Sequence, residues 1–306
     1  MSTAAPSHTH AHSIAANEQT RGDPTRTKTL RRTYSQKLRG HLGRLSAAIR
    51  QGVVKRDAFG LRAARNADPE PLPSFTATPS GQRQDAFMRW LRRQEERGIL
   101  EEVSRNGNTY VRQAYSRGVD HADAHLNKAG VEVPESALEE TFNRPVHQQS
   151  LQRLFSAQYS ELEGVTEAMN QEIGRELADG FSRGQNPTTI ARRITDRVST
   201  IGKTRAETTA RTGVIKAHSE ATLNRYEEAG VRGVTVRAEW STAGDSRVCP
   251  VCATLEGQTW TIEKARTETF RYEASDAEPS SLTGEYPVKP PSHPRCRCSL
   301  LPAIIN

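Results

Sequence analysis

All four cysteines of the chain lie near its C-terminal end, in two short clusters about 40 residues apart. The first cluster is Cys249-Pro250-Val251-Cys252, and the second is His293-Pro294-Arg295-Cys296-Arg297-Cys298. Two thiols three residues apart can bind one metal ion, because a tight turn places both sulfurs about 2.3 Å from a tetrahedral centre. The two clusters therefore predict a small C-terminal module in which distant segments are tied together.

A structural zinc site, disulfide bonds and unliganded thiols are the three alternatives for these cysteines. Paired thiols in a chain that is not secreted bind metal more often than they form disulfides, so we expect Zn²⁺. Nothing marks one of the cysteines as an activated nucleophile. Five candidate ligands compete for four positions, and we expect Cys249, Cys252, His293 and either Cys296 or Cys298, with Cys298 preferred. A site of four cysteines that leaves His293 outside the shell is the alternative.

The composition suits a helical protein with a limited core. The 306 residues allow one large or two modest domains, and 34% of them are hydrophobic, 6% aromatic and 26% charged. No run of 18 apolar residues predicts a transmembrane helix. Residues 1–17 lack the apolar segment of a signal peptide. We therefore expect the protein to fold in a cytoplasm, where its thiols stay reduced.

Positive charge is concentrated at the N-terminal end. Residues 1–66 contain 13 Lys/Arg against 3 Asp/Glu, so this region carries +10 and the rest of the chain −3 of the total +7. Such a basic arm predicts an acidic partner, either nucleic acid or an acidic protein surface. The alternative is a solvated charged helix. The candidate contact residues are Arg31, Arg32, Lys37, Arg39 and Arg44.

Apolar residues at three- and four-residue steps predict a mainly helical body. The helices are expected over residues 29–59, within 82–129 and over 146–181. Asn186 is a favourable N-cap with proline in the first turn, so another helix should begin there. A separate helix over 204–229 carries a stripe of small residues that permits close approach of another helix.

The pattern changes after Gly233. Alternating residues predict a strand that ends at Trp240 and a second strand over 258–262, and we expect Trp240 to pack over the cysteine site. Residues 267–294 are rich in Pro, Ser and Glu and are expected to form a long loop.

These elements predict an α+β fold, with a mainly helical body and a small mixed C-terminal α/β module stapled by a Cys/His zinc site. The expected divisions are a disordered tail (1–28), a basic helical arm (29–66), a Pro-rich linker (67–80), a helical body (81–200) and a C-terminal domain (201–306).

The order of motifs in the C-terminal domain is specific. It runs from an alanine-rich helix through Gly230-Val231 and Trp240 to Asp245-Ser246-Arg247-Val248-Cys249-Pro250-Val251-Cys252, and ends in Pro290-Pro291-Ser292-His293-Pro294-Arg295-Cys296-Arg297-Cys298. This order resembles the Mu F-like family of minor head proteins, also called head morphogenesis proteins, of tailed bacterial and archaeal viruses. The resemblance covers residues 135–303 well and 80–134 loosely.

The resemblance implies an assembly role rather than an enzyme. Such proteins enter the viral procapsid in few copies, commonly beside the portal, and are associated with DNA packaging or delivery. The implied partners are portal, capsid and scaffold proteins and possible viral double-stranded DNA, with no membrane. The implied location is the virion, and the host cytoplasm during assembly.

Two further function classes are compatible with the residues. One is a zinc-containing nucleic-acid-binding protein, and the other is a zinc-dependent nuclease or transferase. A hydrolytic zinc needs an open coordination position and a nearby base, whereas surplus cysteine ligands favour a closed site. The sequence also lacks a P-loop, G-x-G-x-x-G, H-E-x-x-H and G-x-S-x-G.

Overall fold

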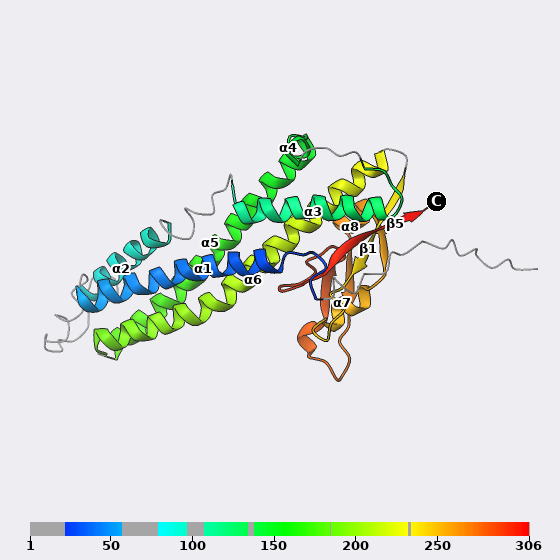
Figure 1. Ribbon diagram of the computed structural model, residues 1–306. Coiled ribbons are helices and arrows are strands. Elements are labelled where there is room, and N and C mark those ends of the chain that lie inside the picture. The colour runs from blue at the N-terminus through cyan, green and yellow to red at the C-terminus, as the bar shows by residue number, and fades with distance from the viewer. Residues whose placement is uncertain are drawn as a thin grey trace, which may run out of the picture. The chain divides into compact units, whose positions relative to one another are not determined.

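The computed structural model describes residues 22–56, 79–96, 107–133, 138–183, 185–231 and 234–305. Within these ranges the chain is mostly helical, with a small strand-containing region at its C-terminal end, as expected (Figure 1). The helices are α1 (Lys28–Ile49), η2 (Arg50–Lys55), α2 (Pro79–Glu95), α3 (Thr109–Lys128), α4 (Leu138–Phe142), α5 (Pro145–Ser182), α6 (Pro187–Val231), α7 (Pro250–Leu255), α8 (Ile262–Thr267) and η5 (Ser280–Leu282). The strands are β1 (Thr235–Ser241), β2 (Thr259–Thr261), β3 (Thr269–Tyr272), β4 (Gly284–Pro287) and β5 (Ser299–Ile305).

The chain divides into two compact units, each built from segments that are separated in the sequence. Unit 1 comprises Met1–Leu30, Thr109–Leu154 and Arg211–Asn306, and unit 2 comprises Arg31–Asn108 and Phe155–Ala210. The sequence-based domain boundaries stay a prediction, and most of the expected tail and linker, residues 1–21 and 67–78, lies outside the described residues.

Unit 2 has a core of apolar side chains from five helices, α1, η2, α2, α5 and α6. The stripe predicted on the basic arm is buried along α1, and residues from α2, α5 and α6 join it. The described members are Tyr34, Leu38, Leu42, Leu45, Ile49, Val53, Phe87, Leu91, Met169, Ile173, Leu177, Ile190, Ile194 and Val198. Gly180 permits the close approach of α5 and α6, because a Cβ there would lie 2.6 Å from Ile190 Cγ1.

Helix α6 corrects one expectation. Asn186 caps it as expected, since the Thr188 amide donates to Asn186 Oδ1 at 2.9 Å. However, the helix runs without a break to Val231, so the separate helix predicted over 204–229 is wrong. Gly202 lies inside it, where a glycine costs about 1 kcal/mol relative to alanine. A Cβ at that position would lie 2.5 Å from Leu42 Cδ1, so a larger residue would displace the end of the Leu42 side chain. Close packing therefore favours glycine here despite its low helix propensity.

The helices of unit 1 pack closely through small residues. A Cβ on Gly118 of α3 would lie 2.3 Å from the carbonyl oxygen of His218 and 2.8 Å from Ala221 Cβ, both on α6. The predicted small-residue stripe of α6 therefore meets a glycine on α3, and only Gly allows this approach.

An antiparallel sheet of order β2-β1-β5 forms the base of the C-terminal region. Trp240 is fully buried in the same apolar cluster as Cys252, Cys296 and Cys298, as expected. Strand β5 was not predicted, because Pro302 interrupts its apolar run. Pro302 lies opposite Ala238 of β1, and β5 is an edge strand of the sheet, where proline is tolerated. The Leu300 carbonyl of β5 accepts from Tyr226 Oη at 3.2 Å and lies 2.9 Å from His121 Nε2.

The expected long loop over 267–294 is also corrected. Strands β3 and β4 form an antiparallel hairpin within it, with Phe270 opposite Tyr286 and their ring centroids 6.0 Å apart. The Pro- and Ser-rich residues between the strands concealed the short alternating pattern from Thr269 to Tyr272.

Among the helices of the described residues, none combines the length and the apolar character that crossing a membrane requires.

Candidate metal centre

The first cysteine pair is organised by the start of α7. Cys249 is the N-cap residue, and its sulfur accepts a hydrogen bond from the Cys252 amide at 3.4 Å. Pro250 occupies the first helical turn, where its missing N–H costs nothing. This turn brings both sulfurs close together, as binding to one metal ion requires.

The second segment enters the site through a tight turn. The Cys296 amide donates to the His293 carbonyl at 3.2 Å, and Arg295 between them has φ of 70°, a conformation uncommon for a residue other than glycine. Cys298 then leads directly into β5. The strand pairing of β5 with β1 thus anchors this segment beside the first pair.

All five predicted ligands come together, in two groups that share Cys252. One group is Cys249, Cys252 and His293, and the other is Cys252, Cys296 and Cys298. His293 Nε2 lies 3.1 Å from each of the Cys249 and Cys252 sulfurs. The sulfurs of Cys252 and Cys296 are 3.9 Å apart, far longer than a disulfide bond of about 2.05 Å. The separation is close to the roughly 3.8 Å between ligands of a tetrahedron with 2.3 Å bonds.

Neighbouring groups shift the protonation of these ligands. A hydrogen bond from the Cys252 thiol lowers the pKa of Cys249 to about 4. Contact with Cys249 raises the pKa of His293 to about 9, although burial opposes this. Contact with Cys249 in turn raises the pKa of Cys252, so these crowded thiols do not all ionise by themselves. A bound dication would stabilise them as thiolates, and zinc is a metal that such a Cys/His set binds well. Bound to His293, the metal would replace a proton.

An ion pair also links the two segments. The Asp245 carboxylate lies 2.9 Å from the Arg247 guanidinium, and this ion pair orders the turn before Cys249. The Arg297 guanidinium, between Cys296 and Cys298, binds the same carboxylate in bidentate fashion at 2.7 and 2.5 Å. These contacts hold the pKa of Asp245 well below its usual range, chiefly through Arg297. Sequence reasoning missed Arg297, because only the fold brings it to Asp245.

The five basic residues proposed for an acidic partner do not form one patch. Arg31 is buried, and Arg39 is half-buried and lies 3.4 Å from Glu207. Arg32, Lys37 and Arg44 are exposed. Because a helix turns about 100° per residue, Arg32 and Arg39 lie on one side of α1 and Lys37 and Arg44 on another.

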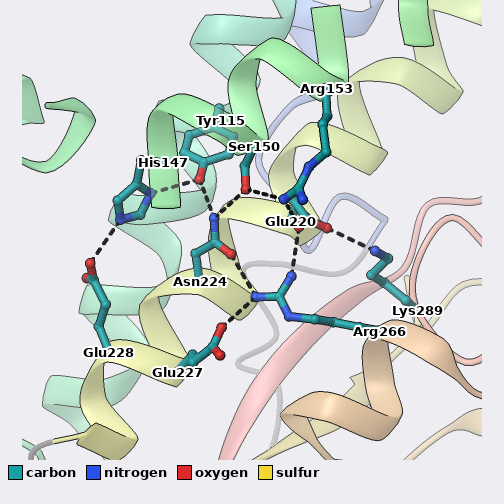
Figure 2. Close-up of polar contacts among 10 residues, drawn as sticks. All are labelled: Tyr115, His147, Ser150, Arg153, Glu220, Asn224, Glu227, Glu228, Arg266 and Lys289. Carbon is teal, nitrogen blue, oxygen red and sulfur yellow. Dashed lines mark hydrogen bonds and ion pairs between the residues drawn. The ribbon is translucent and has the colours of Figure 1, made fainter. Parts of the chain in front are cut away.

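Unit 1 also contains a buried polar network that the sequence did not reveal (Figure 2). Tyr115 Oη lies 2.7 Å from His147 Nδ1 and accepts from Asn224 Nδ2 at 2.6 Å. His147 Nε2 lies 3.2 Å from Glu228 Oε1, and Asn224 also donates to Ser150 at 3.1 Å. Tyr115 has one hydroxyl hydrogen; when it donates to His147 Nδ1, the other ring nitrogen donates to Glu228. The network joins α3, α5 and α6 across long sequence separations.

The fold and this Cys/His group together define a helical protein with a small C-terminal module suited to a metal. Residues 171–301 match the family described as Phage Mu protein F like protein, and all five ligand candidates fall inside the match. Residues 171–301 thus form a domain that matches the Mu F-like family of phage head morphogenesis proteins, which confirms the resemblance over this part of the chain. No curated protein and no solved structure matches the chain.

Proposed function

We propose that the chain is a minor capsid protein of a tailed virus, incorporated in the procapsid near the portal and involved in head assembly and DNA packaging or delivery. The single observation that carries this is the family match over residues 171–301, which includes the whole candidate metal centre. A phage head protein associates with other capsid components and belongs in the virion. The portal, the scaffold and the packaged DNA are the proposed partners, and assembly would take place in the host cytoplasm.

Quantitative mass spectrometry of purified procapsids and mature virions tests this proposal. We expect the chain in both, at far fewer copies than the major capsid protein, and crosslinks to the portal. A chain found only in the soluble lysate, with normal heads formed in its absence, would contradict the proposal.

We further propose that the C-terminal module holds one structural zinc ion. Cys252 is common to both ligand groups, and His293 lies 3.1 Å from two sulfurs, which supports Cys249, Cys252 and His293 as three ligands. Cys296 or Cys298 would complete the shell. Zinc would supply cross-linking of two distant segments rather than chemistry, since four protein ligands close its coordination sphere.

Metal analysis of single substitutions identifies the ligands. Replacing a true ligand with serine or alanine should remove most of the metal, whereas replacing the spare thiol should leave about one ion per chain. Full-length wild-type chain purified without chelator provides the reference. Absence of zinc from this reference would overturn the metal site.

For the basic arm we propose an acidic partner that contacts exposed residues on two sides of α1, Arg32 on one side and Lys37 and Arg44 on the other. Binding to DNA through such charges releases counterions and weakens steeply between about 50 and 200 mM salt, whatever the base sequence. The triple substitution of these residues by glutamine should reduce both DNA retention and incorporation into particles. A variant that retains both would leave α1 as a solvated helix.

A further inference from the structure

Helix α6 contacts the chain on both sides of the candidate ligand His293. The Lys289 ammonium donates to Glu220 Oε2 at 2.9 Å, and the Arg211 guanidinium donates to the Arg295 carbonyl at 3.4 Å. Glu220 and Arg211 are nine residues apart, which corresponds to about 14 Å along a helix. One rigid element therefore holds the His293 segment at two points.

Glu220 is the more enclosed of these two holding points, and Figure 2 shows its partners Arg266, Lys289 and Arg153. Its side chain is 13% exposed, and Arg266 of α8 donates to Oε1 at 2.7 Å while Lys289 occupies Oε2. Arg153 lies 4.0 Å from the carboxylate. Burial raises the pKa of Glu220, but the charges of Lys289 and Arg266 outweigh it, so the pKa is lowered overall. The carboxylate is thus charged and has partners on both oxygens.

The connection from Lys289 to His293 is short and stiff. Only Pro290, Pro291 and Ser292 lie between them. Proline rings fix φ at two of these three residues. Ser292 Oγ donates to the Pro287 carbonyl at 2.6 Å, which restrains the third. A displacement of Lys289 is therefore transmitted to the imidazole rather than absorbed by the loop.

We propose that Glu220 is a positioning residue for the metal centre. Through Lys289 it holds His293 Nε2 next to the sulfurs of Cys249 and Cys252, so that the imidazole takes one coordination position in place of a fourth thiolate. This inference rests on the proposed metal site. Through this contact, α6 would determine which four of the five candidate side chains bind the metal.

The test compares metal binding by full-length variants. Zn²⁺ affinity is measured by competition with a chelator, and the ligand set by the absorption of bound Co²⁺. Glu220→Ala and Lys289→Met should each weaken Zn²⁺ binding about 10- to 100-fold, the usual effect of losing a group that orients a ligand. Their Co²⁺ spectra should move towards that of His293→Ala. Lys289→Arg, which retains the charge, should restore most of the affinity.

Glu227→Ala is the matched control. Glu227 accepts from Arg266 at 3.0 Å, as Glu220 does, but the described contacts of Lys289 are to Glu220. This variant should bind Zn²⁺ like the wild type. In a His293→Ala background, Lys289→Met should have no further effect on affinity, because Lys289 acts through the imidazole.

If Lys289→Met and Glu227→Ala bind Zn²⁺ with equal affinity, the role of Glu220 is overturned. It is also overturned if Lys289→Met still weakens Zn²⁺ binding in the His293→Ala background. Circular dichroism shows whether Glu220→Ala folds. If it does not, the test rests on Lys289→Met, which should fold because 21% of the Lys289 side chain is exposed. A wild-type chain that binds neither Zn²⁺ nor Co²⁺ overturns the metal site itself, and this inference with it. Metal bound equally by the wild type and both variants overturns only this inference.

Discussion

Unit 2 and the C-terminal region of unit 1 are stabilised in different ways. Unit 2 buries apolar side chains from five helices, so its cohesion is spread over many side chains. Residues 234–305 have short strands and a smaller apolar cluster around Trp240, to which specific cross-links are added, among them the Cys/His group, the bridge between Asp245 and Arg297, and the contact of Lys289 with α6. A dispersed core tolerates the loss of one member, whereas a cross-linked module depends on individual side chains.

The largest effect should come from Cys252→Ser. Because Cys252 is common to both ligand groups, we expect metal content to fall from about one ion per chain towards none. Residues 234–305 should become sensitive to protease, while most helical circular dichroism is retained. Metal analysis and limited proteolysis measure this, with Ser280→Ala, an exposed position in the same region, as the control. A complete loss of helicity would contradict the contrast between the two regions.

A core substitution in unit 2 should show the opposite pattern. Ile173 on α5 is fully buried, and Ile173→Ala should lower the free energy of unfolding by about 2–5 kcal/mol through lost burial and a cavity. Metal content should not change. Denaturant unfolding measures the loss, with Gln171→Ala on the exposed face of the same helix as the control. Loss of metal in Ile173→Ala would mean that the two regions are coupled.

The two regions should also respond to pH in opposite directions. Glu95 in unit 2 is 4% exposed, and burial raises its pKa to about 7, although a hydrogen bond from Asn170 at 2.8 Å opposes this. The folded state then keeps a proton that the unfolded state releases above its ordinary pKa of 4.5. The contribution of Glu95 to stability is therefore greatest below about pH 4.5 and falls as the pH rises to about 7. In contrast, low pH would protonate the candidate ligands of the proposed metal site, so zinc bound there should be released.

Glu95→Gln tests the pH dependence of stability that we expect from unit 2. It should remove most of the pH dependence between about 4.5 and 7 and stabilise unit 2 at pH 8 by up to about 3 kcal/mol. Thermal unfolding at several pH values measures it, with Glu96→Gln, an exposed neighbour, as the control. An unchanged pH profile would mean that Glu95 is ionised at neutral pH.

The smallest effect should come from Arg39→Ala. Its ion pair with Glu207 is more than one-third exposed on both sides, so its removal should change the free energy of unfolding by less than about 1 kcal/mol. Any larger change, measured by denaturant unfolding beside Arg32→Ala, would show that unit 2 also depends on individual polar contacts.

The sequence predicted the regular elements and the composition of the site, but not the contacts that order the site. Apolar periodicity located α1 and α5, and the side chains predicted from the spacing of the cysteines do lie together in the fold. Strand β5 was missed because Pro302 is typical of a loop, and its pairing with β1 is a tertiary property. The contact between Glu220 and Lys289 joins residues 69 apart, and no local pattern indicates it.

The pairing of β1 with β5 has a consequence for the order of folding. Joining Ser241 to Ser299 closes a loop of 58 residues when nothing else connects these strands. If a metal already links Cys249 to Cys298, the loop that remains to be closed when Ser241 pairs with Ser299 is only about ten residues long. Because the entropy of loop closure grows with the logarithm of length, the metal would lower the cost of pairing by about 1.5 kcal/mol. The ion would then act as a nucleus, and the sheet would form at a rate that depends on the zinc concentration.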